Sequence, residues 1–546
     1  MTQDSGKEIH SMTDTANTEE SKTIGEVIRE AFGELGSTLG AFIKAPKALW
    51  GVNIPYVIEG LVYFGILTIL GKYCSENVGL SDLHAGWIYS LVTAGITFAM
   101  LFLGGVCDKI GVPRTLTISF VLFVIGRGLV ALSGTIDLGQ GLNSPMFLVL
   151  ALGLFIYVVA YGLYQPAAYA GVKRYTNPKT AAMGYAVVYG LMNLGAFFSG
   201  FVSPTIRHRF VNVFPPNGLT AVFWAYTGLC VIALVITLII LNRKTDAAAV
   251  ERVARETANL ADRDTTTDTE EDAKPEGTAS VAKPENLRFI VFASAAAISI
   301  GAALAATTGR LAVAPWITYV AAAGLATLAV FEFLRVRPDH PFRDGRFSFF
   351  IFILIPVQTL FAHVWLTVPY YLDRAFRGSV VSEYFEFFSN ISPILIFILA
   401  PLIAGLTARV NAYTIMIIGT LVMALPTFLL VIGPSLIPFL AYVLLMSIGE
   451  AMWSPRFLQW IAEIAPPGKT GLYMGIGQFP WFLTKFVTGL YSGYFVATYI
   501  PKPETGLPAN TEVMWLIYGF IAMISPIALI LARKWMVAGM KEKHEG

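Results

Sequence analysis

Charge is scarce in this chain of 546 residues: Asp, Glu, Lys and Arg make up only 14% of it, against about a quarter in soluble domains. The formal net charge of +2 does not supply the concentrated basic surface that phosphate binding requires, so we exclude nucleic acid as a partner. The three cysteines stand apart, without a C-x-x-C or Cys/His spacing, which excludes a zinc site and a disulfide framework.

Signatures of energy conversion and of catalysis are also missing. The sequence has no G-x-x-x-x-G-K-[ST] loop for nucleotide phosphates. It has no nucleophile, metal-ligand or acid–base constellation at useful spacing. We therefore expect neither an ATP-driven machine nor an enzyme, and no cofactor or metal.

Apolar sequence is abundant: 55% of the residues are hydrophobic and the mean hydropathy is +0.64. Runs of about 20 apolar residues, enough to cross about 30 Å of hydrocarbon, recur between short loops. We predict an all-α polytopic membrane protein with about fourteen transmembrane helices, in groups of six, two and six. The predicted spans are 52–73, 85–107, 113–133, 146–170, 181–206 and 220–241; 289–308 and 312–333; and 349–372, 385–407, 413–432, 437–460, 471–498 and 512–532.

The segments outside the spans differ in composition. Residues 1–22 are polar, unlike a cleaved signal peptide, and we expect a disordered cytoplasmic tail. Residues 23–50 predict an amphipathic interfacial helix, either a lead into the first span or a partner-binding element. Residues 243–287 are charged and predict a cytoplasmic linker, partly helical near 248–260. The bundles are then 51–242 and 337–546, the latter with a short cytoplasmic tail, and 288–336 holds two inserted helices.

Lysine and arginine collect in alternate loops, and positively charged loops stay in the cytoplasm. We therefore place both termini inside and expect a multi-pass protein of the cell inner membrane that acts as a monomer in the lipid bilayer. The residues of the basic loops are Lys109, Arg114, Lys173, Arg174, Lys179, Arg243, Lys244, Arg335, Arg337, Arg343, Arg346, Lys469, Arg533, Lys534, Lys541 and Lys543.

The loop after the second predicted span carries Gly104, Asp108, Lys109, Gly111 and Arg114 in the spacing G-x-x-x-D-[RK]-x-G-x-x-[RK]. It resembles the signature loop of the major facilitator superfamily, at the position that this family gives it. The resemblance implies two six-helix bundles and a gating motif whose carboxylate docks on a neighbouring helix in one conformation and releases it in another. An ordinary tight turn with orienting charge is the alternative.

A second resemblance, to the proton-dependent oligopeptide transporter family, covers most of the membrane part. Residues 59–65, Glu-Gly-Leu-Val-Tyr-Phe-Gly, are similar to the end of that family's ExxERFxYYG motif, and Asn193 and Glu450 fall in patterns similar to its aromatic-x-x-x-N-x-G and G-E…S-P…A-P stretches. The inserted helix pair also resembles its bacterial members. Departures are clear: Tyr56 and Gly60 stand where the motif has Glu and Arg, and Gln165 replaces a Lys. The resemblance thus implies the fold and transport, with an altered proton relay.

Three ionisable residues of the predicted spans are candidates for binding solute or protons, since a charge in the bilayer needs a partner, water or a function. By the resemblance, Glu450 faces the cavity and attracts a cationic group; a structural ion pair is the alternative. Glu59, without its neighbouring Arg, is expected either to exchange a proton or to be hydrogen-bonded between helices. Lys485 is expected to pair with one of these acids or to contact the substrate.

Five further residues complete the predicted site. Arg127 either holds an anionic group, or its side chain snorkels to the membrane surface or is salt-bridged. His363 titrates near neutrality, which suits proton coupling, although a packed, hydrogen-bonded His is the alternative. Tyr63, Gln165 and Asn193 are expected to add neutral contacts to a cavity of polar and aromatic side chains.

These features predict a secondary active transporter that moves a small organic solute by alternating access. We expect coupling to protons and a peptide-like or other small metabolite as solute. Two alternatives stay open: an exporter or exchanger of a non-peptide metabolite or amphiphile, and a non-transporting sensor or assembly protein on the same fold.

Overall fold

The computed structural model describes residues 33, 45–264, 287–307, 315–338, 340–407, 410–464, 473, 476–477 and 479–536. The predicted tail 1–22 and most of the predicted interfacial helix 23–50 lie outside these residues. The described part of the chain is helical and contains no strand. Ten of its helices are long and apolar enough to cross a membrane, and 385–400 is a shorter apolar segment. The prediction of an all-α polytopic membrane protein is confirmed.

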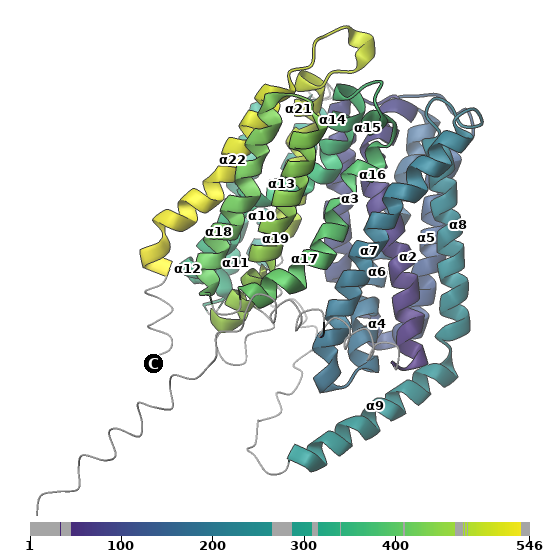
Figure 1. Ribbon diagram of the computed structural model, residues 1–546, viewed down its shortest axis with the longest axis vertical. Coiled ribbons are helices and arrows are strands. Elements are labelled where there is room, and N and C mark those ends of the chain that lie inside the picture. Colours follow the sequence, from purple (N-terminus) through teal and green to yellow (C-terminus); the bar gives the residue numbers. More distant parts are fainter. Residues whose placement is uncertain are drawn as a thin grey trace, which may run out of the picture.

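Six long helices form the first bundle, the N-half, on the right of Figure 1. Serine side chains begin two of them: the Ser81 and Ser144 hydroxyls accept hydrogen bonds from the backbone N–H groups of His84 and Phe147, as expected at a helix N-terminus. The elements are α2 (Lys47–Lys72), η1 (Tyr73–Asn77), α3 (Asp82–Leu103), α4 (Val106–Ile110), α5 (Val112–Ser133), α6 (Pro145–Tyr175), α7 (Pro178–Phe210) and α8 (Leu219–Ile240).

Glycines set the distance between α2 and α7. A Cβ added at Gly60 would lie 2.9 Å from the carbonyl oxygen of Met192, and one added at Gly195 would lie 2.4 Å from that of Val57. The two backbones therefore touch at these positions, which small residues permit in membrane helices. An arginine at position 60 does not fit this packing, so the departure from the ExxER pattern has a steric cause.

The second bundle, the C-half, is built from broken helices. Pro356 and Pro369 stand in the first turns of α13 and α14, and Pro426 in that of η4, where the missing N–H of proline costs no helical hydrogen bond. The predicted continuous spans 349–372, 385–407 and 413–432 are thus interrupted. The elements are η3 (Pro341–Arg343), α12 (Gly345–Ile353), α13 (Ile355–Leu366), α14 (Val368–Ala375), α15 (Val380–Glu383), α16 (Phe385–Ser389), α17 (Ser392–Leu406), α18 (Ala412–Ala424), η4 (Leu425–Ile432), α19 (Leu436–Ile464), α21 (Phe479–Tyr499), η5 (Pro503–Thr505) and α22 (Thr511–Leu531).

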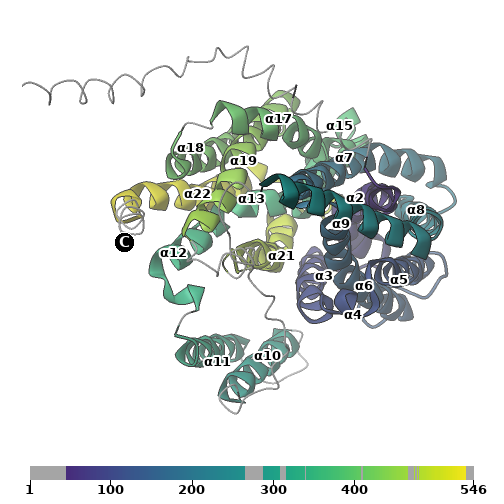
Figure 2. The ribbon, with the colours of Figure 1, turned by 90° about the horizontal axis from the view of Figure 1, so that it is seen from below.

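Two helices that lie between the two halves in the sequence form a separate pair. The helices α10 (Leu287–Thr307) and α11 (Pro315–Arg335) pack on each other, and among the described residues they hardly touch the two bundles. Figure 2 shows the pair standing apart from both bundles. This position agrees with lipid-facing packing.

The predicted linker contains a helix, α9 (Arg243–Asp264), that lies across the base of the N-half (Figures 1 and 2). Asp246 accepts hydrogen bonds from Arg174 Nε (2.9 Å) and from the Tyr175 hydroxyl (2.7 Å). Asn177 donates to Glu256 at 2.9 Å. The helix is therefore tied to the end of α6 and to the turn that follows it.

We expect acid to loosen α9. Burial raises the pKa of Asp246, but the hydrogen bonds from Arg174 and Tyr175 outweigh it and hold that pKa below its usual range. A depressed pKa in the folded state stabilises above the ordinary Asp pKa, and this contribution, about 1 kcal/mol or less, is lost as the pH falls through the folded-state value. Amide protection factors of α9, which correct for the intrinsic pH dependence of exchange, should fall at pH 3 relative to pH 7, and Asp246→Asn should lower them at neutral pH. Glu251→Gln, which removes only a pair within α9, is the control.

The two halves touch closely where α3 begins and α21 ends. A Cβ at Gly86 would lie 2.7 Å from the carbonyl oxygen of Gly489, and one at Gly493 would lie 2.3 Å from that of Asp82. We call this the α2–α3 end of the molecule. Backbone meets backbone there across the boundary between the halves.

Candidate functional site

A buried ion pair occupies the middle of the N-half. Arg127 of α5 donates from Nη1 to Glu59 Oε2 (2.7 Å) and from Nη2 to Oε1 (2.5 Å) of α2. The side chains are 1% and 2% exposed. The guanidinium also donates to Cys230 Sγ and stacks near the rings of Phe123 and Tyr157. Two-point geometry with additional partners is what a buried pair needs to offset its desolvation.

This pair bears on the two expectations about Glu59. Glu59 was expected either to exchange a proton or to be hydrogen-bonded between helices, because Gly60 replaces the neighbouring Arg of the motif; α5 supplies an arginine in its place. Of the alternatives for the two residues, the structure contains a carboxylate held between helices and a salt-bridged Arg127. Of the two alternatives for Lys485, the described structure does not contain the pairing with an acid: Glu59 is paired with Arg127, and Glu450 Oε2 has no partner.

Breaking the pair on one side should destabilise the protein. Arg127→Met leaves the Glu59 carboxylate buried without a partner, and we expect a loss of about 3–5 kcal/mol in the free energy of unfolding. Adding Glu59→Gln removes the orphaned charge and should restore most of it. Thermal unfolding of the purified protein measures both, with the exposed Arg114→Met as control. Equal stability of the single variant and the wild type would contradict a structural role for the pair.

Neutral polar groups join the inner surfaces of three N-half helices. Gln165 of α6 donates to the Tyr56 hydroxyl at 2.9 Å, and that hydroxyl contacts Met192 Sδ of α7 at 3.5 Å. Tyr63 packs against Tyr161, with ring centroids 4.8 Å apart. The structure thus brings Tyr63 and Gln165 to the same inner region as Glu59.

Exposed tyrosines continue this surface toward the C-half. Tyr169 and Tyr189 are 43% and 53% exposed, and the Tyr185 hydroxyl reaches the Tyr169 carbonyl oxygen at 3.5 Å. Asn193 donates to the backbone of its own helix, at Tyr189 O. Tyr189 also interacts electrostatically with Glu450 of α19. The tyrosine surface of α6 and α7 therefore faces the one predicted acid of the C-half.

Glu450 is buried and incompletely paired. Its side chain lies on α19 and is 3% exposed, yet Oε2 has no hydrogen-bond partner. Gly449 places α19 backbone-to-backbone against α18, since a Cβ there would lie 2.4 Å from the Met423 nitrogen. The glutamate is thus held on a rigid helix pair at the boundary between the halves. A buried oxygen without a partner is rare in proteins and marks a candidate binding group.

Aromatic side chains lie beside this acid. Trp453 of α19 stacks on Trp481 of α21, with centroids 5.8 Å apart, and Phe361 of α13 contacts Trp481. Trp365 of the same helix meets Phe64 of the N-half at 5.2 Å. Lys485, one turn along α21, is half-buried. These residues supply the mixed polar and aromatic surface that the sequence predicts.

The structure places His363 away from this surface. Its ring lies inside the C-half, fully buried. Nδ1 lies 2.8 Å from Thr367 Oγ1, Nε2 lies 3.0 Å from the Tyr491 hydroxyl, and the ring stacks on Tyr518 at 3.8 Å. Both nitrogens are satisfied by neutral groups, so the packed, hydrogen-bonded alternative describes this residue.

A polar network at the α2–α3 end joins the two halves. Lys72 of α2 bonds to Glu76 at 2.7 Å and forms an ion pair with Asp373 of α14. Arg374 donates to Asp82 of α3 at 2.9 and 3.1 Å, and both of these side chains are 4% exposed. We call these five residues the end network.

A second contact strengthens the same end. Arg207 of α7 donates to Glu386 Oε1 of α16 at 2.6 Å, and Glu386 is fully buried. Asn390 donates to Thr68 across the halves at 3.1 Å. Within the described ranges no ion pair joins the halves at the opposite end. The molecule is closed at the α2–α3 end.

Sequence reasoning missed these gate-like pairs. Lys72, Arg207 and Arg374 are among the few basic residues of the loops at that end. In the sequence they indicate only the orientation of the chain in the membrane. A usable signal was present: acids at Asp82 and Asp373 stand beside helix ends in both halves. Cations and anions that recur at the same end of two bundles indicate contacts between them.

The predicted gating motif forms α4 and the turn into α5. Gly111 adopts φ of +83°, a conformation that favours glycine. Asp108, Lys109 and Arg114 are exposed, and Gly104 packs near Pro166 of α6. The structure shows the turn; docking of the Asp108 carboxylate stays a prediction.

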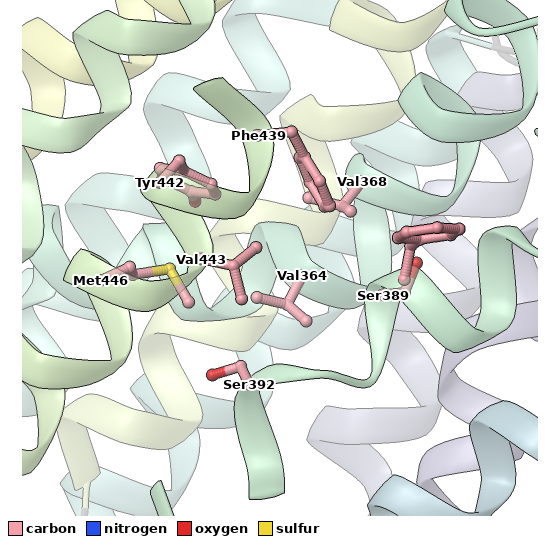
Figure 3. Close-up of a pocket in the computed structure, with 9 residues that line it drawn as sticks. Val364, Val368, Ser389, Ser392, Phe439, Tyr442, Val443 and Met446 are labelled. Carbon is pink, nitrogen blue, oxygen red and sulfur yellow. The ribbon is translucent and has the colours of Figure 1, made fainter. Parts of the chain in front are cut away.

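The C-half also contains a small cavity between α13, α14, α16, α17 and α19 (Figure 3). Only about 10 Å³ of it is open to the centre of a water molecule, and it is walled mostly by apolar side chains such as Val364, Val368 and Met446. None of the predicted site residues lines it. A charged solute does not fit such a wall, so the candidate site lies between the halves.

Comparisons with known proteins agree with this architecture. Residues 54–395 match the family model described as Major Facilitator Superfamily. Dipeptide and tripeptide permease A of Pectobacterium carotovorum is 21% identical over 90% of this chain and 91% of its own length, and the protein of that name in Escherichia coli K12 is 22% identical over 90% and 92%. A crystal structure of peptide transporter POT, carrying a glutamate-to-glutamine mutation, superposes with a TM-score of 0.63 at 18% identity, covering 90% of this chain and 95% of that one.

The two helical halves, the boundary site and the match over more than half of the sequence agree. The chain therefore belongs to the Major Facilitator Superfamily of membrane transporters, and it is related to the peptide permeases of that superfamily.

Proposed function

We propose that this chain is a proton-coupled transporter of small solutes that carry a positively charged amino group, and that Glu450 binds in turn the proton and that group. One observation carries the proposal. Three carboxyls buried in the described helices, Glu59, Asp82 and Glu386, are paired with arginines. Glu450, the fourth buried carboxyl of the described residues, has an oxygen without a partner.

Physics explains why one unpaired acid serves both partners. A bare carboxylate in the membrane interior is costly, and either a proton or an ammonium group relieves that cost. Binding of one excludes the other, so a proton gradient can be exchanged for solute as the halves alternate. The Trp453–Trp481 stack beside Glu450 adds a surface that attracts organic cations.

We further propose that both termini are cytoplasmic and that the α2–α3 end faces outward. The excess of Lys and Arg in the loops at the opposite end supports this orientation. The structure is then the form closed to the outside, with the exposed Tyr169 and Tyr189 on the inner side. One chain supplies both halves of the site, which supports a monomer. The names of the relatives, dipeptide and tripeptide permeases, support peptide-like solutes.

Uptake into proteoliposomes tests the proposal. The purified chain is reconstituted, a pH gradient with the acidic side inside is imposed so that outward proton movement can drive exchange, and di- and tripeptides are compared with pooled metabolites that lack an amino group. We expect accumulation of amino-bearing solutes that collapses when a protonophore removes the gradient. Accumulation that does not depend on the pH gradient would reject proton coupling. Accumulation of anionic solutes in preference to amino-bearing ones would reject the positive charge assigned to the solute.

A further inference from the structure

A groove opens on the α10–α11 pair, away from the boundary between the halves. Arg288, Val291 and Phe292 of α10 and Glu332 of α11 line it, and about 300 Å³ of it is open to the centre of a water molecule. The three residues of α10 recur at spacings of three and four, so they share one face of that helix. Since the pair stands apart from both bundles (Figure 2), the groove is separate from the candidate site.

The groove lies at the membrane level where phospholipid headgroups are found. The rings of Phe289 and Phe333 lie 5.2 Å apart, so the first turn of α10 stands beside the last turn of α11. Each helix has 21 residues, about 30 Å at 1.5 Å per residue, which matches the hydrocarbon thickness. Arg288 is in that first turn and Glu332 in that last turn. Their charges therefore lie at the border of the headgroup layer.

Two opposite charges line the groove, and they are not paired with each other. Arg288 is exposed and has no ion pair among the described residues. Glu332 is 14% exposed and accepts a hydrogen bond at Oε2 from Arg335 Nε (3.0 Å). No described residue donates to its Oε1. The groove thus offers a cation and a carboxylate oxygen to a ligand.

The surface around the groove is apolar. Ile290 and Val291 of α10 are 44% and 55% exposed, and Val330 and Phe331 of α11 are 54% and 63% exposed. Exposed apolar side chains on helices long enough to cross the bilayer contact acyl chains rather than water. A water-soluble ligand would have to displace lipid from this surface, so the occupant that fits it is a molecule of the bilayer.

We propose that this groove binds a zwitterionic phospholipid whose headgroup carries a primary ammonium, that is, phosphatidylethanolamine. Arg288 binds the phosphate, Glu332 Oε1 accepts from the ammonium, and an acyl chain lies on Val291 and Phe292. The two charges select this class. An anionic headgroup brings no cation for Glu332, and a trimethylammonium headgroup has no N–H to donate. The inference is independent of the solute assigned above.

Native mass spectrometry of the purified, delipidated protein tests the assignment. The protein is titrated with phosphatidylethanolamine, phosphatidylcholine and phosphatidylglycerol that carry the same acyl chains, and the fraction with one bound lipid is measured. We expect the wild type to bind phosphatidylethanolamine about fivefold more tightly than either of the other two, as one additional charge-assisted hydrogen bond supplies.

Two variants separate the two charges. Arg288→Gln should weaken the binding of all three lipids by about fivefold, because each carries a phosphate. Glu332→Gln should remove the preference for phosphatidylethanolamine, and it should strengthen the binding of phosphatidylglycerol because Arg335 is released from its acid. Lys534→Gln, at an exposed position outside the pair, is the control and should change neither affinity nor preference. Thermal unfolding of each variant verifies that it is folded.

The other outcomes would each overturn the proposal. Equal binding of the three lipids by the wild type would indicate unselective lipid around the protein. Tighter binding of phosphatidylglycerol than of phosphatidylethanolamine would indicate a site for anionic lipid. A dimer that forms without bound lipid would assign the groove to a second copy of the chain. An unchanged preference in Glu332→Gln would remove the carboxylate from recognition of the headgroup.

Discussion

We expect the Glu450→Gln variant to lose the gradient-driven accumulation of amino-bearing solutes in proteoliposomes. The variant keeps the shape of the side chain but can neither lose a proton nor hold an ammonium group as an ion pair. Replacing a hydrogen bond to a charged group by a neutral one costs about 1.5–3 kcal/mol, which corresponds to a fall of roughly 10- to 100-fold in the initial rate of uptake. Uptake by proteoliposomes with and without a pH gradient measures it.

Stability distinguishes this effect from misfolding. Because Glu450 Oε2 has no partner to lose, the variant should unfold at the same temperature as the wild type or a higher one. Glu504→Gln, on an exposed loop, is the matched control and should transport normally. Full gradient-driven accumulation by Glu450→Gln would remove this residue from the coupling mechanism.

Removing Arg374 should open the α2–α3 end. The Asp82 carboxylate, 4% exposed, would be left without its arginine, and breaking a buried pair costs about 3–5 kcal/mol. This cost falls only on the conformation in which the halves touch at that end. A shift of 3 kcal/mol changes the ratio of two conformations by more than about 100-fold, so Arg374→Ala should favour the form open at the α2–α3 end.

A native cysteine reports this opening. Cys74 lies in η1 beside the end network and is fully buried. Its labelling by a membrane-impermeant maleimide, located by peptide mass spectrometry, should be much faster in Arg374→Ala than in the wild type. Arg377→Ala removes an exposed arginine from the turn that follows α14 and should not change the rate. Equally slow labelling of Arg374→Ala would show that the backbone contacts hold this end closed without the ion pair.

The fold could be predicted from the sequence because lipid imposes a simple rule. A segment of about 20 apolar residues has few ways to satisfy its backbone other than a helix across the membrane. The apolar runs therefore located the helices of both bundles and the inserted pair. Breaks within the C-half were less visible, although Pro356, Pro369 and Pro426 mark them, since proline in a membrane helix is compatible with continuity.

Candidate site residues were found one at a time, and their partners were not. An ionisable residue in an apolar run is conspicuous, so Glu59, Arg127 and Glu450 could be selected. Arg127 lies 68 residues from Glu59, and Arg374 lies 292 residues from Asp82. Helix spacing in one chain does not specify which distant helix faces which. Pairing is a property of the packed bundle, as is the enclosure of His363.

While the α2–α3 end is closed, the glycine contact between α3 and α21 acts as a fulcrum for opening the opposite end. Where Gly86 meets Gly489, no side chain separates the two helices, so the halves can tilt about this point with little sliding. The lever arm is long: α21 has 21 residues, about 30 Å at 1.5 Å per residue, so a tilt of about 10° moves its far end by about 5 Å. A small change of angle at this contact therefore becomes a displacement of several ångströms at the far end of α21. A methyl group at Gly86 would collide with the Gly489 carbonyl oxygen and force the two helices apart.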